Sequence, residues 1–275
     1  MPFGPSEGTR GQNRIVPGPA PAPNGAMDMA IAFPLAALVG IFLLAGAVKG
    51  LTGMGLPTIA MGLLGLGMPP AAAAAMLVVP SMVTNVWQLA AGPELGPLMR
   101  RLWPMLLGIV VGTIAGAGAL ATTDPTWSGC ALGLALIAYA GHALLAPPLT
   151  VPARHERGWS PTVGLATGLV TGATGVFVIP AVPYLQALGL QRDTLVQALG
   201  LSFTVSTLAL AIGLGAHGAF RFEQAGLSTL AVVPALAGMW LGGRLRQRIP
   251  PARFRVGFLV CLLLLGLELA SRPWR

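Results

Sequence analysis

Long apolar segments separated by short polar stretches make up almost all of the chain after residue 29. They fall at residues 30–50, 54–68, 71–91, 102–121, 126–146, 161–177, 178–190, 194–217, 227–243 and 256–271. Most reach the length of about 20 residues that a helix needs to cross a bilayer. Runs such as the leucines at 262–265 lack the alternation of β-barrel strands. The pattern therefore predicts an all-α, polytopic membrane protein.

Two of these segments, 54–68 and 178–190, are too short to cross the bilayer comfortably at about 1.5 Å per residue. They are either tilted short helices or halves of re-entrant hairpins. Basic residues gather in the predicted loops 92–101, 147–160 and 244–255. All three loops lie on one side of the membrane only if every segment crosses, as the positive-inside rule requires. We therefore favour ten crossings, eight by long helices and two by short or broken ones.

This topology divides the chain into two inverted repeats of about five hydrophobic segments each. The first transmembrane repeat covers residues 29–146 and the second covers 161–275, with a cytoplasmic linker at 147–160. Residues 1–28 are rich in proline and glycine and have too little apolar surface to form a core. We predict a disordered tail there.

Glycines interrupt the apolar pattern at matching places in the two halves. The first cluster is Gly46, Gly50, Gly53 and Gly55, and the second is Gly164, Gly168, Gly172 and Gly175. Pro57 and Pro180 follow the two clusters. Backbone broken at membrane depth is tolerated only where protein or a hydrated cavity satisfies its polar groups. Paired interruptions of this kind are typical of a transporter's substrate site.

The two interrupted stretches resemble the TauE/SafE sulfite exporter family, also called the toluene sulfonate uptake permease family. The resemblance rests on K-G-L-T-G-M-G-L-P at 49–57 with G-M-P-P at 67–70, and on T-G-A-T-G-V-F-V-I-P at 171–180. It covers the chain after residue 29, although the family's glycine cluster is usually denser. It implies a membrane permease for sulfite, sulfonates or other small organosulfur or organic anions, with a direction of transport that varies among members.

Composition excludes a water-soluble fold, because 55% of the residues are hydrophobic, 9% are charged and the mean hydropathy is +0.77. The net charge of +8 does not indicate a nucleic-acid partner, since the basic residues lie in short loops where they determine topology. Cys130 and Cys261 both fall inside predicted spans, and we interpret them as packing residues.

Lys49 is the sharpest candidate for function, because an ionisable residue at membrane depth is by default a functional-site hypothesis. A cation beside the first glycine cluster would attract an anionic substrate, helped by the positive ends of broken helices. Alternatively, Lys49 lies at a helix end and its amine reaches up to the membrane interface.

Polar side chains form a stripe on segment 71–91. Ser202 and Ser206, on the matching segment 194–217, are weaker candidates for the same substrate site. The stripe consists of Ser81, Thr84, Asn85 and Gln88, at helical spacing. Such hydroxyls and amides can bind the oxygens of a sulfonate or carboxylate. They can equally join helices by hydrogen bonds, worth on the order of 0.6 kcal/mol each.

The predicted substrate site therefore gathers polar and backbone-breaking residues from both halves. It comprises Lys49, Thr52, Gly53, Gly55, Pro57, Ser81, Thr84, Asn85, Gln88, Thr171, Gly172, Thr174, Gly175, Pro180, Ser202 and Ser206. The glycine ladders at 108–116 and 238–242 are instead expected to pack helices closely.

An enzyme is disfavoured, because the spans hold no paired carboxylates, metal-ligand cluster or nucleophile elbow. No phosphate-binding loop appears, and we predict no cofactor and no metal. The expected partners are a small anion and the lipid bilayer, and a homo-oligomer is compatible with the sequence. An anion channel and the membrane subunit of a larger transport complex remain the alternatives to a plasma-membrane permease.

Overall fold

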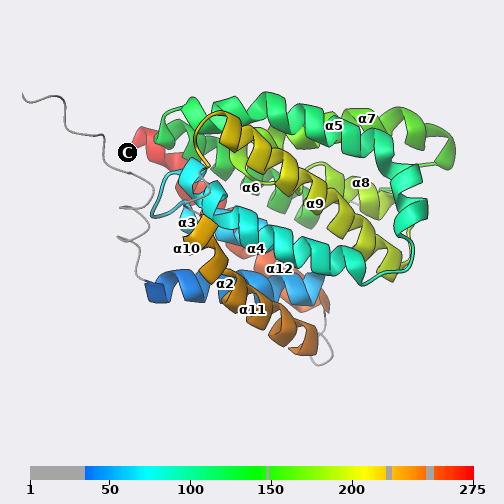
Figure 1. Cartoon of the computed structure of the whole chain (residues 1–275), viewed down its shortest axis with the longest axis horizontal. Helices are drawn as coiled ribbons and strands as arrows, with labels where there is room; N and C mark the ends of the chain where they lie inside the picture. Colours follow the sequence, from blue (N-terminus) through cyan, green and yellow to red (C-terminus); the bar gives the residue numbers. More distant parts are fainter. Residues whose placement is uncertain (1–34, 147–148, 221–224, 246–250) are drawn as a thin grey trace, which may run out of the picture.

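The computed structural model describes residues 35–146, 149–220, 225–245 and 251–275, and the regular structure in these ranges is helical (Figure 1). In chain order the helices are α2 (Leu35–Thr52), α3 (Leu56–Leu64), α4 (Pro70–Ala90), α5 (Leu95–Thr122), α6 (Pro125–Leu145), α7 (Ala153–Thr174), α8 (Ala181–Ala187), α9 (Arg192–Ala216), α10 (Ala225–Leu230), α11 (Val232–Leu245), α12 (Pro251–Ser271) and the short 3-10 helix η2 (Arg272–Trp274). The predicted all-α class is confirmed. The predicted tail at 1–28 lies outside the described residues.

Six helical stretches in the described ranges are long and apolar enough to cross a membrane: α2, α4, α5, α6, α9 and Val256–Trp274. The short helices match the two short segments of the sequence pattern. With nine residues in α3 and seven in α8, they are only about 14 and 11 Å long. Neither helix alone spans about 30 Å of hydrocarbon. The ten-crossing topology stays a prediction.

Two helices begin earlier than the hydrophobic pattern predicts. Helix α5 starts at Leu95 and α7 at Ala153, so Arg100, Arg101 and Arg154 lie on helices rather than in loops. The prediction of loops throughout 92–101 and 147–160 was wrong there. Arginine is a good helix former, and apolar character marks only the part of a helix that faces lipid or core.

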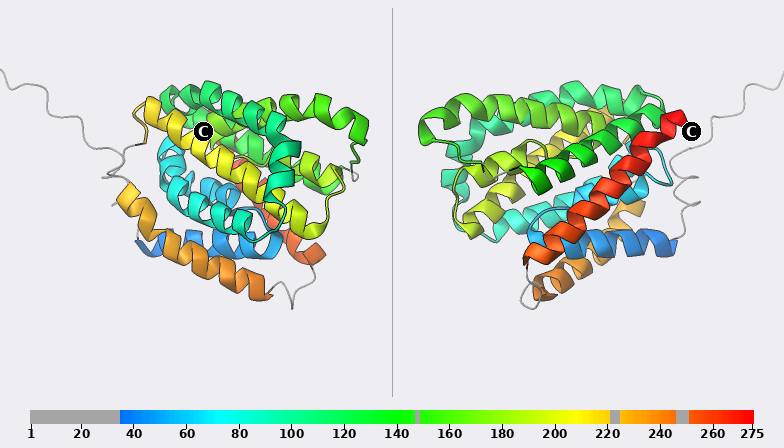
Figure 2. Two further views of the ribbon diagram at one scale, coloured as in Figure 1. Left: turned by 45° about the vertical axis from the view of Figure 1, so that its right-hand side comes forward. Right: turned by 180° about the vertical axis from the view of Figure 1, so that it is seen from behind.

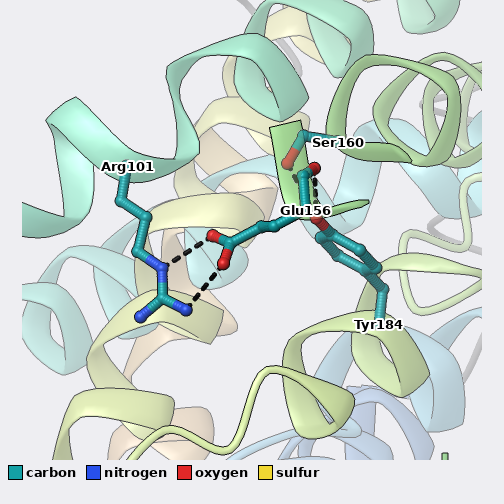
Figure 3. Close-up of polar contacts among 4 residues, drawn as sticks. All are labelled: Arg101, Glu156, Ser160 and Tyr184. Carbon is teal, nitrogen blue, oxygen red and sulfur yellow. Dashed lines mark hydrogen bonds and ion pairs between the residues drawn. The ribbon is translucent and has the colours of Figure 1, made fainter. Parts of the chain in front are cut away.

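A polar cluster fixes the early part of α7 against α5 and α8 (Figure 3). The Arg101 guanidinium donates to both carboxylate oxygens of Glu156, at 2.6 and 2.8 Å. The Tyr184 hydroxyl donates to the Glu156 carbonyl at 3.0 Å and lies 2.8 Å from the Ser160 hydroxyl. Paired, charge-assisted bonds of this kind hold direction as well as distance. The hydrogen bonds of Tyr184 therefore attach the short helix α8 to the part of α7 that the Arg101–Glu156 pair holds against α5.

The predicted segment 227–243 is not one helix, because a break at Ala231 separates α10 from α11. Pro234 explains the break. It has no N–H to donate to the carbonyl of Leu230, so the helical hydrogen-bond ladder is interrupted at this turn.

Two helix pairs pack through glycine and form opposite edges of the molecule (Figure 1). Helix α5 lies along α7, and α2 lies along α11. A Cβ at Gly108 would be 2.5 Å from the Pro161 carbonyl oxygen, and one at Gly116 would be 2.8 Å from that of Leu169. In the second pair, a Cβ at Gly238 would meet the backbone of Leu43. Both predicted packing ladders are confirmed.

Two further pairs lie between these edges. Helices α4 and α9 cross one face, while α6 and α12 lie together on the face seen from behind (Figure 2). Gly133 and Gly266 meet backbone to backbone in the second pair, since a Cβ at Gly133 would be 2.6 Å from the Gly266 carbonyl oxygen. The Cys130 thiol contacts the Ala270 carbonyl nearby. Residue numbers rise along one helix as they fall along the other, so this pair is antiparallel.

A hydroxyl on α10 supplies a hydrogen bond that the backbone of α4 lacks. Pro80, inside α4, cannot donate to the carbonyl of Met76. The Ser228 hydroxyl donates to that carbonyl at 2.7 Å and accepts the N–H of Val79 at 3.3 Å. This contact satisfies a backbone group that lipid could not satisfy.

Replacing Ser228 with alanine is expected to destabilise the protein by about 1–3 kcal/mol, because the Met76 carbonyl loses its partner. Thermal unfolding in detergent measures the change. Pro80→Ala restores an N–H at position 80, which can serve Met76 directly. In a double-mutant cycle, the loss caused by Ser228→Ala should therefore shrink in the Pro80→Ala background. An equal loss in both backgrounds would contradict this role of Ser228.

Candidate functional site

Helix α2 ends just before Gly53 and Gly55, the last two glycines of the first cluster, whereas Gly46 and Gly50 lie inside the helix and pack against α11. Gly53 has φ 79° and its N–H donates to the Lys49 carbonyl at 2.7 Å, which closes the last turn. The Thr52 hydroxyl lies within hydrogen-bonding distance of the carbonyls of Val48 and Met54, at 2.9 and 2.7 Å, and has one hydrogen to donate to them. The chain then turns through a second left-handed glycine, Gly55, into α3. The sequence thus fixes where Lys49 stands, one turn before a break.

Helix α7 ends in the same way at the second glycine cluster. Gly175 has φ 72° and its N–H donates to the Thr171 carbonyl at 2.8 Å. The Thr174 hydroxyl donates to the Val170 carbonyl at 2.7 Å and accepts the N–H of Val176 at 3.3 Å. Gly53 and Gly175 are 122 positions apart. At that spacing, Thr171 occupies the place of Lys49.

The amine of Lys49 is buried, and its side chain reaches across to α4. The residue is 2% exposed. Its Nζ donates to the Thr84 hydroxyl at 3.1 Å and to the amide oxygen of Asn85. The Thr84 hydroxyl in turn donates to the Pro80 carbonyl at 2.8 Å. The geometry is that of a cation turned into the protein, not of an amine extended to the membrane interface.

No carboxylate accompanies this lysine in the described part of the chain. The ion pairs found there join Arg101 to Glu156 and Arg275 to Glu268, away from Lys49. Helices α3 and α4 carry no charged residue. Across the same described ranges, no group of three His, Cys, Asp or Glu residues could hold a metal ion. Because an ammonium has three N–H donors, and Thr84 and Asn85 accept from it, one donor remains for a ligand.

Asn85 links the lysine to the second half of the chain. Its amide nitrogen donates to the Thr207 hydroxyl on α9 at 3.1 Å. The Thr207 hydroxyl in turn donates to the Phe203 carbonyl at 2.7 Å. One turn later, the Gln88 amide nitrogen donates to the carbonyls of Gly53 and Val196, at 2.9 and 2.8 Å. The polar stripe on α4 therefore faces protein and connects α2 to α9.

Several buried polar atoms of α4 and α9 have no hydrogen-bond partner. They are the hydroxyls of Ser81, Ser202 and Ser206 and the amide oxygen of Gln88. Each of these three serines is 0% exposed. A buried hydroxyl left unpaired costs about 1–3 kcal/mol. Unpaired groups gathered on two adjoining helices are what a site for a polar ligand requires.

The other residues of the predicted site have local structural roles. Thr52, Thr171 and Thr174 direct their hydroxyls to carbonyls of their own helices. Gly172 lies in the contact between α7 and α5, where a Cβ would be 2.7 Å from the Ala117 nitrogen. Gly55, Pro57 and Pro180 stand at the starts of the short helices. The structure thus brings together Lys49, Thr84, Asn85 and Gln88, with Gly53 beside them.

Thr207 belongs to this hydrogen-bonded network, and the predicted site omitted it. The sequence held a signal, because Thr207 lies 122 positions after Asn85, the same spacing that separates Gly53 from Gly175. The hydroxyls of Thr58 and Thr113 are also buried without a partner. Nothing in the apolar pattern around those two residues distinguishes them from ordinary packing threonines.

A protein-family model described as sulfite exporter TauE/SafE matches residues 38–269. The chain belongs to the TauE/SafE family. Over 181 residues it is 30% identical to the probable inner membrane transporter protein TsaS of Comamonas testosteroni, which covers 64% of this chain and 74% of that protein. No solved structure matches the chain at a significant level.

Membership of the TauE/SafE family confirms two of the predictions made from the sequence. The chain is a multi-pass membrane protein, and it belongs to a class of transporters rather than of enzymes. The polar network on α2, α4 and α9 falls inside the matched residues. A transporter needs a polar site within its apolar interior, and this network has that character.

Proposed function

We propose that this TauE/SafE protein is a secondary permease of the plasma membrane for small anions, with Lys49 as the cation of the substrate site. The observation that carries the proposal is a buried lysine amine whose hydrogen-bond partners, Thr84 and Asn85, are both neutral. A buried charge without a counterion is strongly disfavoured. An anionic substrate supplies the missing charge, and sulfite, sulfonates and related organosulfur or organic anions fit that description.

We further propose that the two halves are inverted repeats around this site. The helices that match at a spacing of 122, α4 and α9, begin at residues 70 and 192. They run antiparallel, since the end of α4 at Gln88 contacts the start of α9 at Val196. The pairing of α5 with α7 corresponds to that of α11 with α2 under the same exchange. The proposed symmetry supports a first repeat at 29–146, and it places the start of the second repeat at α7, before residue 161.

In the proposed mechanism, the substrate lies between α4 and α9, where Asn85 and Thr207 join the two halves. Lys49 binds the negative charge, and the free hydroxyls of Ser81, Ser202 and Ser206 donate to the substrate oxygens. The backbone breaks at the ends of α2 and α7 would act as hinges between the two halves. Rocking one repeat against the other would expose the site to each side in turn.

The proposal is tested by transport in proteoliposomes that contain the purified full-length chain. Uptake of sulfite, taurine, 4-toluenesulfonate, acetate and chloride is followed with and without an imposed membrane potential. A permease gives saturable flux of one or a few of these anions, whereas a channel gives flux that rises linearly with concentration. Activity that appears only with added proteins would favour a subunit of a larger complex. The absence of flux for every anion would sink the proposal.

Replacing Thr207 with valine is expected to raise the KM for the transported anion by about 5-fold, because Asn85 loses the acceptor that orients it toward Lys49. Valine keeps the shape of threonine. Thr204→Val on the same helix is the matched control, since the Thr204 hydroxyl donates only to its own backbone, the Gly200 carbonyl at 2.7 Å. Equal KM values for the two variants would contradict the role of Thr207 in orienting Asn85.

A further inference from the structure

We propose that the Lys49 site selects monovalent anions, with sulfite bound as hydrogen sulfite, and rejects divalent anions of the same shape. This inference rests on the proposed function, since it concerns the substrate of the same site. It follows from the polar groups that α2, α4 and α9 contribute to the site. One of them, Lys49, is a cation, and the others are neutral hydrogen-bond donors.

The site has one positive charge. Lys49 is the buried cation of α2, and the polar groups that contact it, Thr84 and Asn85, are neutral. Helices α3 and α4 carry no ionisable side chain, and α9 carries Arg192 and Asp193 only in its first turn. The Arg101 guanidinium is already paired with Glu156. Arg192 is exposed, and Lys49 is the only buried lysine or arginine in the described part of the chain.

The remaining ligand contacts are neutral hydrogen-bond donors. The three unpartnered hydroxyls come from both halves, with Ser81 on α4 and with Ser202 and Ser206 one turn apart on α9. Hydroxyls adapt to the oxygens of a tetrahedral or pyramidal oxyanion, but they do not neutralise charge. They can therefore donate to three oxygens of a sulfonate or of sulfate in the same way. The charge of the ligand is what distinguishes the two.

With a monovalent anion bound, the buried site is an ion pair of zero net charge. With a divalent anion, it would hold one uncompensated negative charge away from water. An uncompensated charge in a buried site is strongly destabilising. We expect a divalent anion to bind at least about 100-fold more weakly than a monovalent anion of the same size.

Thr171 offers a way to reverse this preference. It occupies the place of Lys49 in the second half, 122 positions later, and it is 0% exposed. Under the proposed symmetry, a lysine at this position reaches the site from the opposite side. Thr171→Lys should therefore add the second positive charge that a divalent anion requires. Thr171→Met, which has similar bulk and no charge, is the matched control.

The test uses methanesulfonate and sulfate, which share three oxygens in the same arrangement and differ by one charge. Each ion is titrated calorimetrically into the full-length chain in nanodiscs, at constant ionic strength. We expect saturable binding of methanesulfonate, sulfate affinity at least about 100-fold lower, and a rise in sulfate affinity in Thr171→Lys but not in Thr171→Met. The comparison of the two ions on the wild-type protein carries the test whether or not Thr171→Lys folds.

Sulfate binding as tight as methanesulfonate binding would overturn this inference and leave the anion permease standing, provided that Lys49→Met abolishes both. If neither ion binds and neither is transported, the anion site itself is overturned, and the selectivity with it. An unchanged sulfate affinity in a well-folded Thr171→Lys protein would overturn the proposed place of Thr171 opposite Lys49.

Discussion

Lys49→Met should lower the rate of anion transport by roughly 100- to 1000-fold, because it removes the one cation of the proposed site. The substrate would then bring an unpaired negative charge into the protein interior. The variant should remain folded and inserted in the membrane. Methionine fills the space of the lysine stem and removes a buried charge that has no counterion, which offsets the loss of the hydrogen bonds to Thr84 and Asn85.

The measurement is initial uptake in proteoliposomes at matched protein density, with thermal unfolding of the same preparations as the check on folding. Arg100→Met is the control, because it removes an exposed cation from α5 by the same chemical change. We expect near wild-type uptake from the control. Wild-type uptake by Lys49→Met, in a protein with unchanged unfolding temperature, would refute the central role given to this lysine.

Gly168→Ala should destabilise the protein by about 3 kcal/mol, because it separates α7 from α5. The added Cβ would be 2.7 Å from the Thr113 nitrogen and 2.9 Å from the Gly112 carbonyl carbon. These are backbone atoms, so no side chain can rotate away to make room. The two helices would have to move apart along the whole glycine ladder and lose their close packing.

Gly158→Ala is the matched control for this prediction. Gly158 lies on the same helix α7, and a Cβ there has no neighbour within 4 Å. Alanine should be slightly stabilising at this position, by about 0.5–1 kcal/mol, since glycine is a poor helix former. Thermal unfolding in detergent ranks the two variants. A Gly168→Ala protein as stable as Gly158→Ala would show that the α5–α7 contact can relax.

The residues that the sequence could place are those whose role depends on their own chemistry. Apolar runs located the helices, because each residue contributes its hydrophobicity independently of the fold. Lys49 was found because a charge in such a run is costly in any arrangement. Backbone breaks at the two glycine clusters were predicted, and the structure places left-handed turns there at Gly53 and Gly175, a conformation that few other residues adopt.

Contacts between helices were decided only by the tertiary structure. The sequence predicted that the glycine ladders pack helices, but not that Gly168 meets α5 or that Gly238 meets α2. It missed the role of Ser228, because the unpaired Met76 carbonyl lies 152 positions away along the chain. It also placed the start of α5 seven residues late, since polar and charged residues continue a helix without an apolar signal.

For the candidate site, the sequence supplied the lysine and the polar stripe, and the tertiary structure decided which of their groups are engaged. Thr52 and Thr174 satisfy their own helix ends, whereas the hydroxyls of Ser202 and Ser206 stay free. Composition and spacing cannot separate these cases, because every threonine and serine carries the same donor. Whether a donor is already used depends on which backbone carbonyl the fold brings within reach.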